Sequence, residues 1–195
     1  MRILRVMAAA AMAVSLAGCN SMFGNPTSIA RLDVQQRQNA ATSATVILSA
    51  GVRETCFSSY PVMVDLVSAG TGKPLFHFTA NNEFIKPQLD ENHGFIHAAN
   101  VPPGQYYLTL DVWAKQTTSA PVADLTLAPG DLVYLGEFFI DSSCAGFGAI
   151  DTVLIRDRAA RDLAKAAELN PAINPADVEI RVLSFDRQRG TPDRP

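Results

Sequence analysis

Short apolar runs separated by turn residues fill the middle of the chain, from about residue 44 to residue 155. The pattern is clearest in residues 105–113, where every second residue from Tyr106 to Val112 is large and apolar and the residues between include Thr109 and Asp111. Successive side chains of a β-strand point to opposite faces, so a period of two predicts a strand with one buried face. The expected strands cover residues 45–49, 61–67, 75–79, 94–98, 105–113, 122–127, 132–140 and 149–155.

Turn residues separate these runs, and no long helical segment lies between them. Pro103-Gly104 and Pro129-Gly130 are strong turn signals, because Pro restricts φ and Gly accepts a positive φ. Regularly spaced short strands without helices between them favour antiparallel pairing over a parallel βαβ sheet. The predicted fold is therefore mainly β, an antiparallel β-sandwich.

The pattern changes near Asp157, where good helix formers replace the alternation. They predict one short C-terminal helix over residues 157–169, with Asp157 as its N-cap and Pro171 ending it. Residues 178–183 alternate again and predict a last edge strand. The β-sandwich domain is thus expected to cover residues 44–185. Residues 186–195, which are charged and contain Gly and Pro, are expected to form a disordered tail.

The first 18 residues combine a basic start with an Ala-rich apolar stretch and small residues before a cysteine. This order is typical of a secretory signal, and Leu16-Ala17-Gly18-Cys19 resembles the lipobox of bacterial lipoproteins. The resemblance implies removal of residues 1–18 as a signal peptide and acylation of Cys19. The alternative, a retained membrane-spanning helix, needs an apolar stretch of about 20 residues, and this one is shorter.

Acylation at Cys19 would anchor the mature chain in a bilayer, with each buried methylene contributing about 0.8 kcal/mol. The next residue is Asn20, at the position where an Asp keeps lipoproteins of enteric bacteria at the inner membrane. The resemblance therefore implies an outer-membrane lipoprotein that faces the periplasm. Residues 19–43 are polar and small, and they are expected to form a flexible tether.

The charge of the mature chain bears on its partners. Without residues 1–18 it carries 14 Lys and Arg against 19 Asp and Glu. Such an acidic balance lacks the basic surface of a nucleic-acid binder. Nucleic acid is therefore not an expected partner, and the lipid membrane is.

Cys56 and Cys144 remain when Cys19 is assigned to the lipid anchor. An even number of cysteines in an oxidising compartment predicts one disulfide, with two separate buried thiols as the alternative. The bond would close a loop of 88 residues. The chain-entropy model gives about 4–5 kcal/mol for such a loop before strain is subtracted.

Two Pro-Gly segments carry a family resemblance. The segment Val101-Pro-Pro-Gly-Gln-Tyr-Tyr-Leu108 resembles the turn and strand of transthyretin-like (prealbumin-like) sandwiches. The segment Leu127-Ala-Pro-Gly-Asp-Leu-Val-Tyr-Leu-Gly136 resembles a strand of the uncharacterised DUF2846-like bacterial lipoproteins. The resemblance covers residues 44–155 and implies a transthyretin-like sandwich with no known catalytic residues. A type VI secretion lipoprotein has a similar architecture, so a tethering component of an envelope secretion machine is an alternative.

Candidate catalytic and metal-binding residues are few. His77, His93 and His97 are the only histidines, and the last two would share one strand face. Three imidazoles could bind Zn²⁺ or Cu²⁺, but no carboxylate or cysteine completes the set, so neither a metal nor a cofactor is expected. The chain lacks a Gly-x-Ser-x-Gly elbow, a Ser-x-x-Lys pair and a phosphate loop. Asp141 and Asp151 could form an acid–base pair, but loop solvation explains them as well, and the chain is not expected to be an enzyme.

Binding of a partner protein is the remaining class of function. Arg158, Arg161 and Lys165 lie on the predicted helix, whose narrow stripe of Ala and Leu buries little surface alone. Trp113 falls on the nominal outer face of its strand. These four residues are the expected contacts with an envelope protein partner. The prediction is a non-catalytic binding or scaffolding lipoprotein, with a small-ligand-binding or metal-binding lipoprotein as the alternative.

Overall fold

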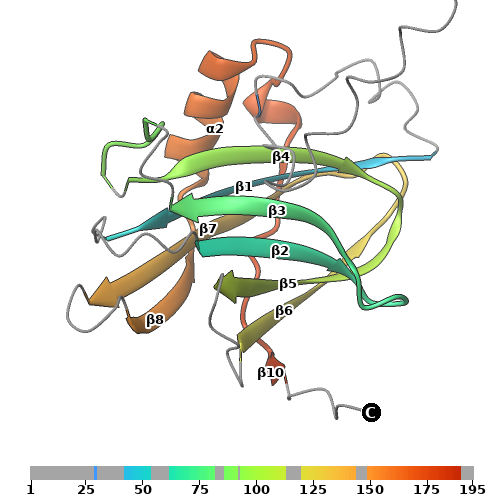
Figure 1. The fold of residues 1–195 in the computed structure, drawn as a ribbon. Helices are drawn as coiled ribbons and strands as arrows, with labels where there is room; N and C mark the ends of the chain where they lie inside the picture. The colour runs from blue at the N-terminus through green and yellow to red at the C-terminus, as the bar shows by residue number, and fades with distance from the viewer. Residues whose placement is uncertain are drawn as a thin grey trace, which may run out of the picture.

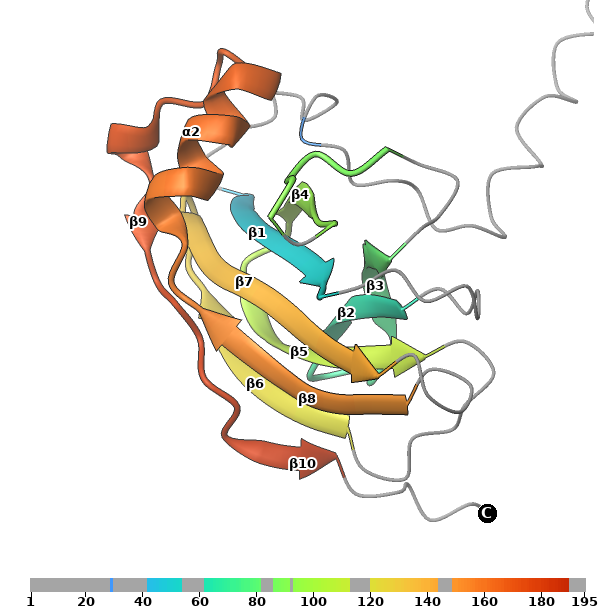
Figure 2. The same cartoon turned by 90° about the vertical axis from the view of Figure 1, so that its left-hand side faces the viewer.

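The computed structural model describes Ile29 and residues 42–53, 62–81, 86–91, 93–112, 120–143 and 149–189. Two β-sheets pack face to face, and one α-helix, α2 (Ala159–Leu169), lies on the outer face of one sheet (Figure 1). The view from the left of Figure 1 shows the helix at one end of the two sheets (Figure 2). The β-sandwich with one short C-terminal helix predicted from the sequence is confirmed.

Each sheet contains five strands within the described residues. Sheet A has the order β4 (Phe95–Val101), β1 (Ala44–Val52), β7 (Leu132–Ser143), β8 (Ala149–Arg156), and β9 (Glu179–Ile180) also pairs with β7. Sheet B has the order β10 (Arg187–Arg189), β6 (Ala120–Leu127), β5 (Gly104–Val112), β2 (Val62–Ser68), β3 (Pro74–Asn81). Every strand predicted between residues 45 and 155 is present.

Sheet A differs from the prediction in the direction of its strands. β7 runs parallel to both β1 and β9, so the expectation of purely antiparallel pairing is wrong for this sheet. The other pairings between the described strands are antiparallel. Parallel neighbours need a long crossover, and here β2 to β6 lie between β1 and β7 in the chain. Alternation reports which face of a strand is buried, but not the direction of its neighbour.

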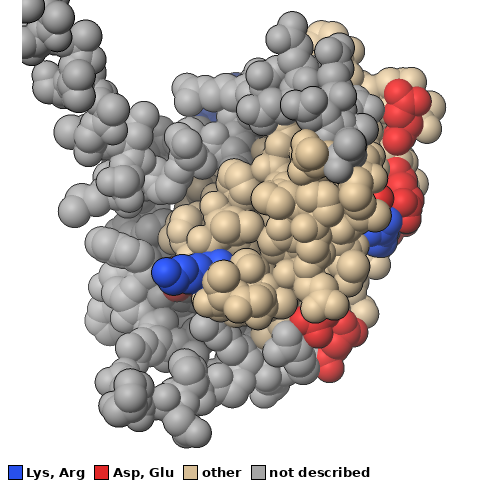
Figure 3. All heavy atoms as spheres, turned by 90° about the vertical axis from the view of Figure 1, so that its right-hand side faces the viewer, with Lys and Arg blue, Asp and Glu red and all other residues tan. Residues whose placement is uncertain are grey.

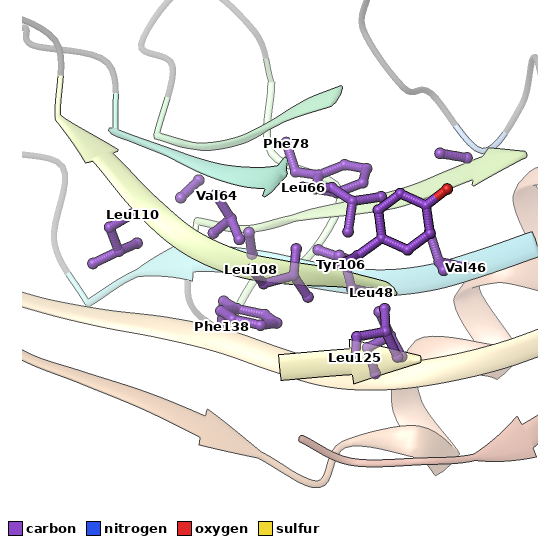
Figure 4. Close-up of a cluster of buried hydrophobic side chains, with 14 of the residues drawn as sticks. Val46, Leu48, Val64, Leu66, Phe78, Tyr106, Leu108, Leu110, Leu125 and Phe138 are labelled. Carbon is purple, nitrogen blue, oxygen red and sulfur yellow. The ribbon is translucent and has the colours of Figure 1, made fainter. Parts of the chain in front are cut away.

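Apolar side chains from both sheets fill the space between them, as the close-up of the core shows (Figure 4). The predicted alternation of β5 is confirmed for Tyr106, Leu108 and Leu110, which point into this core. The Tyr106 hydroxyl donates a 2.6 Å hydrogen bond to the carbonyl oxygen of Pro102. Each fully buried Val, Leu or Phe contributes about 1.5–3 kcal/mol, so this core is the main source of stability of the sandwich.

A second apolar cluster lies between the outer face of sheet A and α2. Ile47 of β1 and Tyr134 of β7 belong to it, together with Leu163 and Ala166 of the helix. This cluster fixes α2 on one half of sheet A, and the other half, formed by β8 and the end of β7, is left uncovered by the helix (Figure 2).

The C-terminal part departs from the prediction in three places. Helix α2 begins at Ala159 and its N-cap is Arg158, so the prediction of Asp157 as the N-cap is wrong. The Asp157 carboxylate accepts a hydrogen bond from the Ala159 backbone amide at 3.0 Å. After α2 and the 3-10 helix η2 (Pro175–Asp177), the predicted strand 178–183 is reduced to β9. The disordered tail predicted from residue 186 is wrong for β10, which pairs with β6.

Candidate functional site

A β-bulge decides which residues of β7 face the helix. β1 and β7 shift register beside Gly136, whose φ of 109° lies in the region that favours glycine. A bulge inserts one residue and so resets the inside–outside alternation. Tyr134 and Glu137 therefore both lie on the helix side of the sheet, although their odd spacing would otherwise separate them. Leu135 and Phe138 both enter the core between the sheets.

Asp162 is the helix residue that meets these side chains. It is fully buried, and a buried carboxylate is costly unless it is hydrogen-bonded. Its Oδ2 accepts hydrogen bonds from the Ser49 hydroxyl and the Tyr134 hydroxyl, each at 2.5 Å. Its Oδ1 accepts one from Nε of Arg161 at 2.8 Å. One carboxylate thus ties α2 to β1 and β7 together.

Glu137 is the second buried carboxylate. Nη2 of Arg161 donates to its Oε1 at 2.7 Å, and Nε of Arg156 donates to its Oε2 at 2.6 Å. The guanidinium carbon of Arg156 lies 3.7 Å from the centre of the Phe139 ring, which is a cation–π contact. Arg161 bridges the two carboxylates. The buried ionic network consists of Ser49, Tyr134, Glu137, Arg156, Arg161 and Asp162.

The electrostatics of the network favour one set of protonation states. Burial raises the pKa of the Tyr134 hydroxyl well above its ordinary value, and the neighbouring Asp162 carboxylate raises it further. Burial alone would lower the pKa of Arg161, but hydrogen bonds to Glu137 and Asp162 outweigh burial and raise that pKa. Tyr134 therefore acts as a neutral donor and Arg161 as a permanent cation.

The network has residue types found in catalytic sites, but the side chains that would carry such chemistry are buried away from solvent. A nucleophilic serine needs a base that takes its proton and space beside it for a substrate. Ser49, Tyr134 and Asp162 have no exposed surface, and the two hydroxyls donate to the same carboxylate oxygen. The arrangement therefore holds α2 against sheet A.

The predicted partner-binding residues of α2 have different environments. Arg161 forms ion pairs with Glu137 and Asp162 in the buried ionic network, so reversal of its charge is expected to disturb the fold. Arg158, at the start of the helix, is the exposed one: 45% of its side chain is accessible, and its Nε lies 3.9 Å from Oε2 of Glu137. Nζ of Lys165 lies 2.7 Å from Oε1 of Glu168 on the same helix. Trp113 lies outside the described residues.

A surface of apolar and basic groups adjoins the network on the uncovered half of sheet A. Leu154 of β8 is 46% exposed and pairs with Phe139 of β7. Arg156 lies two residues further along the same face of β8. The open surface of sheet A is formed by three residues, Leu154, Arg156 and Arg158. Of these three residues, the sequence pattern indicated only Arg158 as a partner contact, because Leu154 in an alternating strand is indistinguishable from a core residue.

The opposite end of the sandwich, where the β2–β3 and β6–β7 turns lie, has a different surface. Viewed from the right of Figure 1, most of its described area has no Lys, Arg, Asp or Glu, and acidic groups lie along one border (Figure 3).

The three histidines do not form one site in the described structure. Nδ1 of His77 lies 2.6 Å from Oδ1 of Asp65 on the neighbouring strand. The His97 ring is buried, with Nε2 2.8 Å from the carbonyl oxygen of Thr79. His93 lies in the turn before β4, with φ of 45°, so the expectation that it shares a strand face with His97 is wrong. Across the described residues, no group of three or more His, Cys, Asp or Glu could hold a metal ion.

Cys19, Cys56 and Cys144 lie outside the described residues. The lipid anchor and the disulfide therefore stay predictions. Asp141, one of the two carboxylates considered for acid–base chemistry, forms a 2.8 Å ion pair with Arg53. In the part of the chain that the structure describes, no helix has the length and apolar character needed to cross a membrane.

Comparison with known proteins adds no relative. No protein-family model matches the chain, and no curated protein matches it. The transthyretin-like assignment consequently remains a prediction that rests on the two Pro-Gly segments.

Proposed function

We propose that the protein is a non-catalytic lipoprotein of the outer membrane that binds or scaffolds an envelope protein in the periplasm. The observation that carries the proposal is the division of roles at the helix–sheet junction. Ser49 and Tyr134 donate hydrogen bonds to the buried Asp162, and Arg161 bridges Asp162 and the buried Glu137. Leu154 and Arg158 face outward. The lipobox at Cys19 supports the location.

The open surface of sheet A suggests the chemistry of the partner. The carboxylates Glu137 and Asp162 are fully buried, whereas Arg156 and Arg158 remain partly exposed. Solvent therefore meets positive charge beside an apolar side chain. Complementary charge across an interface steers association and fixes register, so the surface fits a partner segment that combines acidic residues with an apolar one.

In-cell crosslinking of the full-length protein, followed by purification from membranes, tests this proposal. Arg158→Glu and Leu154→Asp should each reduce the amount of crosslinked partner at least several-fold while the fold survives, because both side chains are exposed. Lys73→Glu is the matched control, since Lys73 is exposed on the β2–β3 turn and undergoes the same charge change. The proposal is wrong if both variants retain the partner, or if purified protein alone turns over a substrate.

A further inference from the structure

Ile29 belongs to the segment expected to be a free tether, yet it is fully buried. It lies in the apolar cluster beneath α2, with Ala166 and Ile173 among the other members. Its carbonyl oxygen accepts a 2.9 Å hydrogen bond from Nδ2 of Asn170. A side-chain contact and a polar contact therefore hold this one residue of the N-terminal segment on the folded domain.

Asn170 is well placed to hold Ile29. It is the C-cap of α2, and its amide donates to the carbonyl oxygen of Ala166 at 2.8 Å. Its Oδ1 accepts a 3.2 Å hydrogen bond from the Ala172 amide. These two contacts orient the side-chain amide and direct Nδ2 toward Ile29. Asn170 is itself buried, so water competes little for this hydrogen bond.

We infer that the membrane tether ends at Ile29 rather than at the first strand, so that the C-terminal end of α2 is the part of the domain nearest the bilayer. This inference rests on the acylation of Cys19 in the proposed function. Ten peptide units separate Cys19 from Ile29, which gives a reach of about 33–36 Å when fully extended. Without the contact at Ile29, the tether would extend to Ser43 and reach about 80–86 Å.

The position of this attachment gives the domain a preferred orientation. Both cartoon views place α2 at one end of the molecule and β10 at the other (Figure 1, Figure 2). A short tether fixed beside the end of α2 keeps Asn170 and Ala172 close to the lipid headgroups. The strands β6 and β10 then point into the periplasm. The bilayer is thus the surface that the α2 end of the domain faces.

Energy transfer to a membrane acceptor tests the orientation in the acylated full-length protein. The protein is placed in vesicles of phosphatidylethanolamine and phosphatidylglycerol that contain a headgroup-labelled acceptor. A fluorescent non-natural amino acid replaces Ala172 or Ser184, both of which are exposed. Transfer should be clearly higher from position 172 than from position 184, and equal transfer from the two positions overturns the inference.

Two insertions locate the end of the tether without touching the folded domain. Ten Gly and Ser residues inserted after Gly24 should lower transfer from position 172, because the root-mean-square span grows from about 16–19 Å to about 22–27 Å. The same insertion after Asn39 should leave transfer unchanged, because Ile29 carries the attachment. Equal loss from both insertions overturns the inference.

A substitution checks the contact itself. Ile29→Asp places a charge in the apolar cluster and should reduce the difference between positions 172 and 184. Gln35→Asp adds the same charge to the same segment and should preserve the difference. If acylated protein gives the same result with both variants, only this inference fails. If the wild-type protein carries no acyl group at Cys19, the proposed function fails with it.

Discussion

Glu137 of β7 and Arg161 of α2 are 24 residues apart in the chain, and Nη2 of Arg161 donates a 2.7 Å hydrogen bond to Oε1 of Glu137. The bond crosses from sheet to helix, and the carboxylate has no exposed surface. Removal of Arg161 would take a guanidinium from two buried carboxylates, Glu137 and Asp162, and a buried charge that loses a partner is costly. The position of α2 therefore depends on a small number of polar atoms.

Truncation of either partner should be strongly destabilising. Arg161→Ala and Glu137→Ala should each lower the free energy of unfolding by about 3–5 kcal/mol, a large share of the roughly 5–15 kcal/mol that holds a domain together. The double variant should lose less than the sum, because the hydrogen bond between Arg161 and Glu137 is removed in each single variant and is therefore counted twice in the sum. Chemical denaturation of the four proteins measures this coupling.

Lys165→Ala is the matched control for that cycle. Lys165 lies on the same helix and pairs with the exposed Glu168, and such surface pairs contribute about 0.3–0.5 kcal/mol. Its loss should barely change the denaturation midpoint. Additive effects of Arg161→Ala and Glu137→Ala would show that the two side chains are energetically independent, contrary to the geometry.

The strands could be predicted from alternation, but the network could not. Val133 and Leu135 are two residues apart and predict one inward face, but Phe138, which also enters the core, is three residues after Leu135. This change in spacing indicates a bulge at Gly136 only when the core residues are already known. Asp162 adjoins Leu163 on the apolar side of the helix. Because Asp162 is charged, the sequence pattern does not indicate that it is buried. Sequence patterns assume that charges face water, and this assumption fails where several charges satisfy one another.

Gly136 should not tolerate a side chain. A Cβ at this position would lie 2.7 Å from Cγ2 of Ile155 and 3.3 Å from the carbonyl oxygen of Arg156, with φ of 109°. Gly136→Ala should therefore destabilise the protein by about 1–3 kcal/mol from backbone strain alone, and the clash adds to this. Thermal denaturation measures the effect.

Gly70→Ala is the control for that substitution, because a Cβ at Gly70 would meet nothing within 4 Å. Alanine there restricts the unfolded chain and should leave stability unchanged or raise it by up to about 1 kcal/mol. An equal melting temperature for the Gly136 and Gly70 variants would contradict the proposed role of the bulge.

Tyr134 should make the protein less stable at high pH. The folded state raises the pKa of Tyr134 above its ordinary value of 10.0, so its contribution to stability is complete below pH 10 and is lost as pH rises further. The unfolded chain releases the proton first, and stability then falls by up to about 1.4 kcal/mol per pH unit for this group. The Tyr134→Phe variant has no hydroxyl proton at this position, so its stability lacks this dependence on pH.

Denaturation of wild-type protein and Tyr134→Phe between pH 7 and pH 11.5 tests that prediction. At pH 7 the variant should be less stable by about 1–3 kcal/mol, because the buried Asp162 loses a donor. The difference should shrink above pH 10. A difference that stays constant over this range would show that Tyr134 titrates normally in the folded state.

Cys19 should be the site of lipid attachment. Cys19→Ala removes the only thiol at the lipobox, so the variant should accumulate as an unprocessed precursor that incorporates no labelled palmitate. Asn20→Asp is the control: it should remain acylated while more of it fractionates with the inner membrane. Normal processing and fractionation of Cys19→Ala would remove the basis for the lipoprotein assignment.

Cys56 and Cys144 should be joined by a disulfide, because two cysteines remain in an oxidising compartment once Cys19 carries the lipid. The last described pair of the parallel strands β1 and β7 is Val52 with Ile140, and each cysteine comes four residues later in the sequence. Beside these residues, Arg53 also contacts Asp141 at 2.8 Å.

Mass mapping of non-reduced protein from the periplasm should find the two cysteine peptides linked. Reduction should lower the free energy of unfolding by up to about 4–5 kcal/mol, the chain-entropy limit for a loop of this length. Cys56→Ser and Cys144→Ser should each cause a similar loss, and the double variant should lose no more than either, because one bond is removed in all three. Reduction should have no effect on these variants. Two free thiols in the native protein would show that the disulfide prediction is wrong.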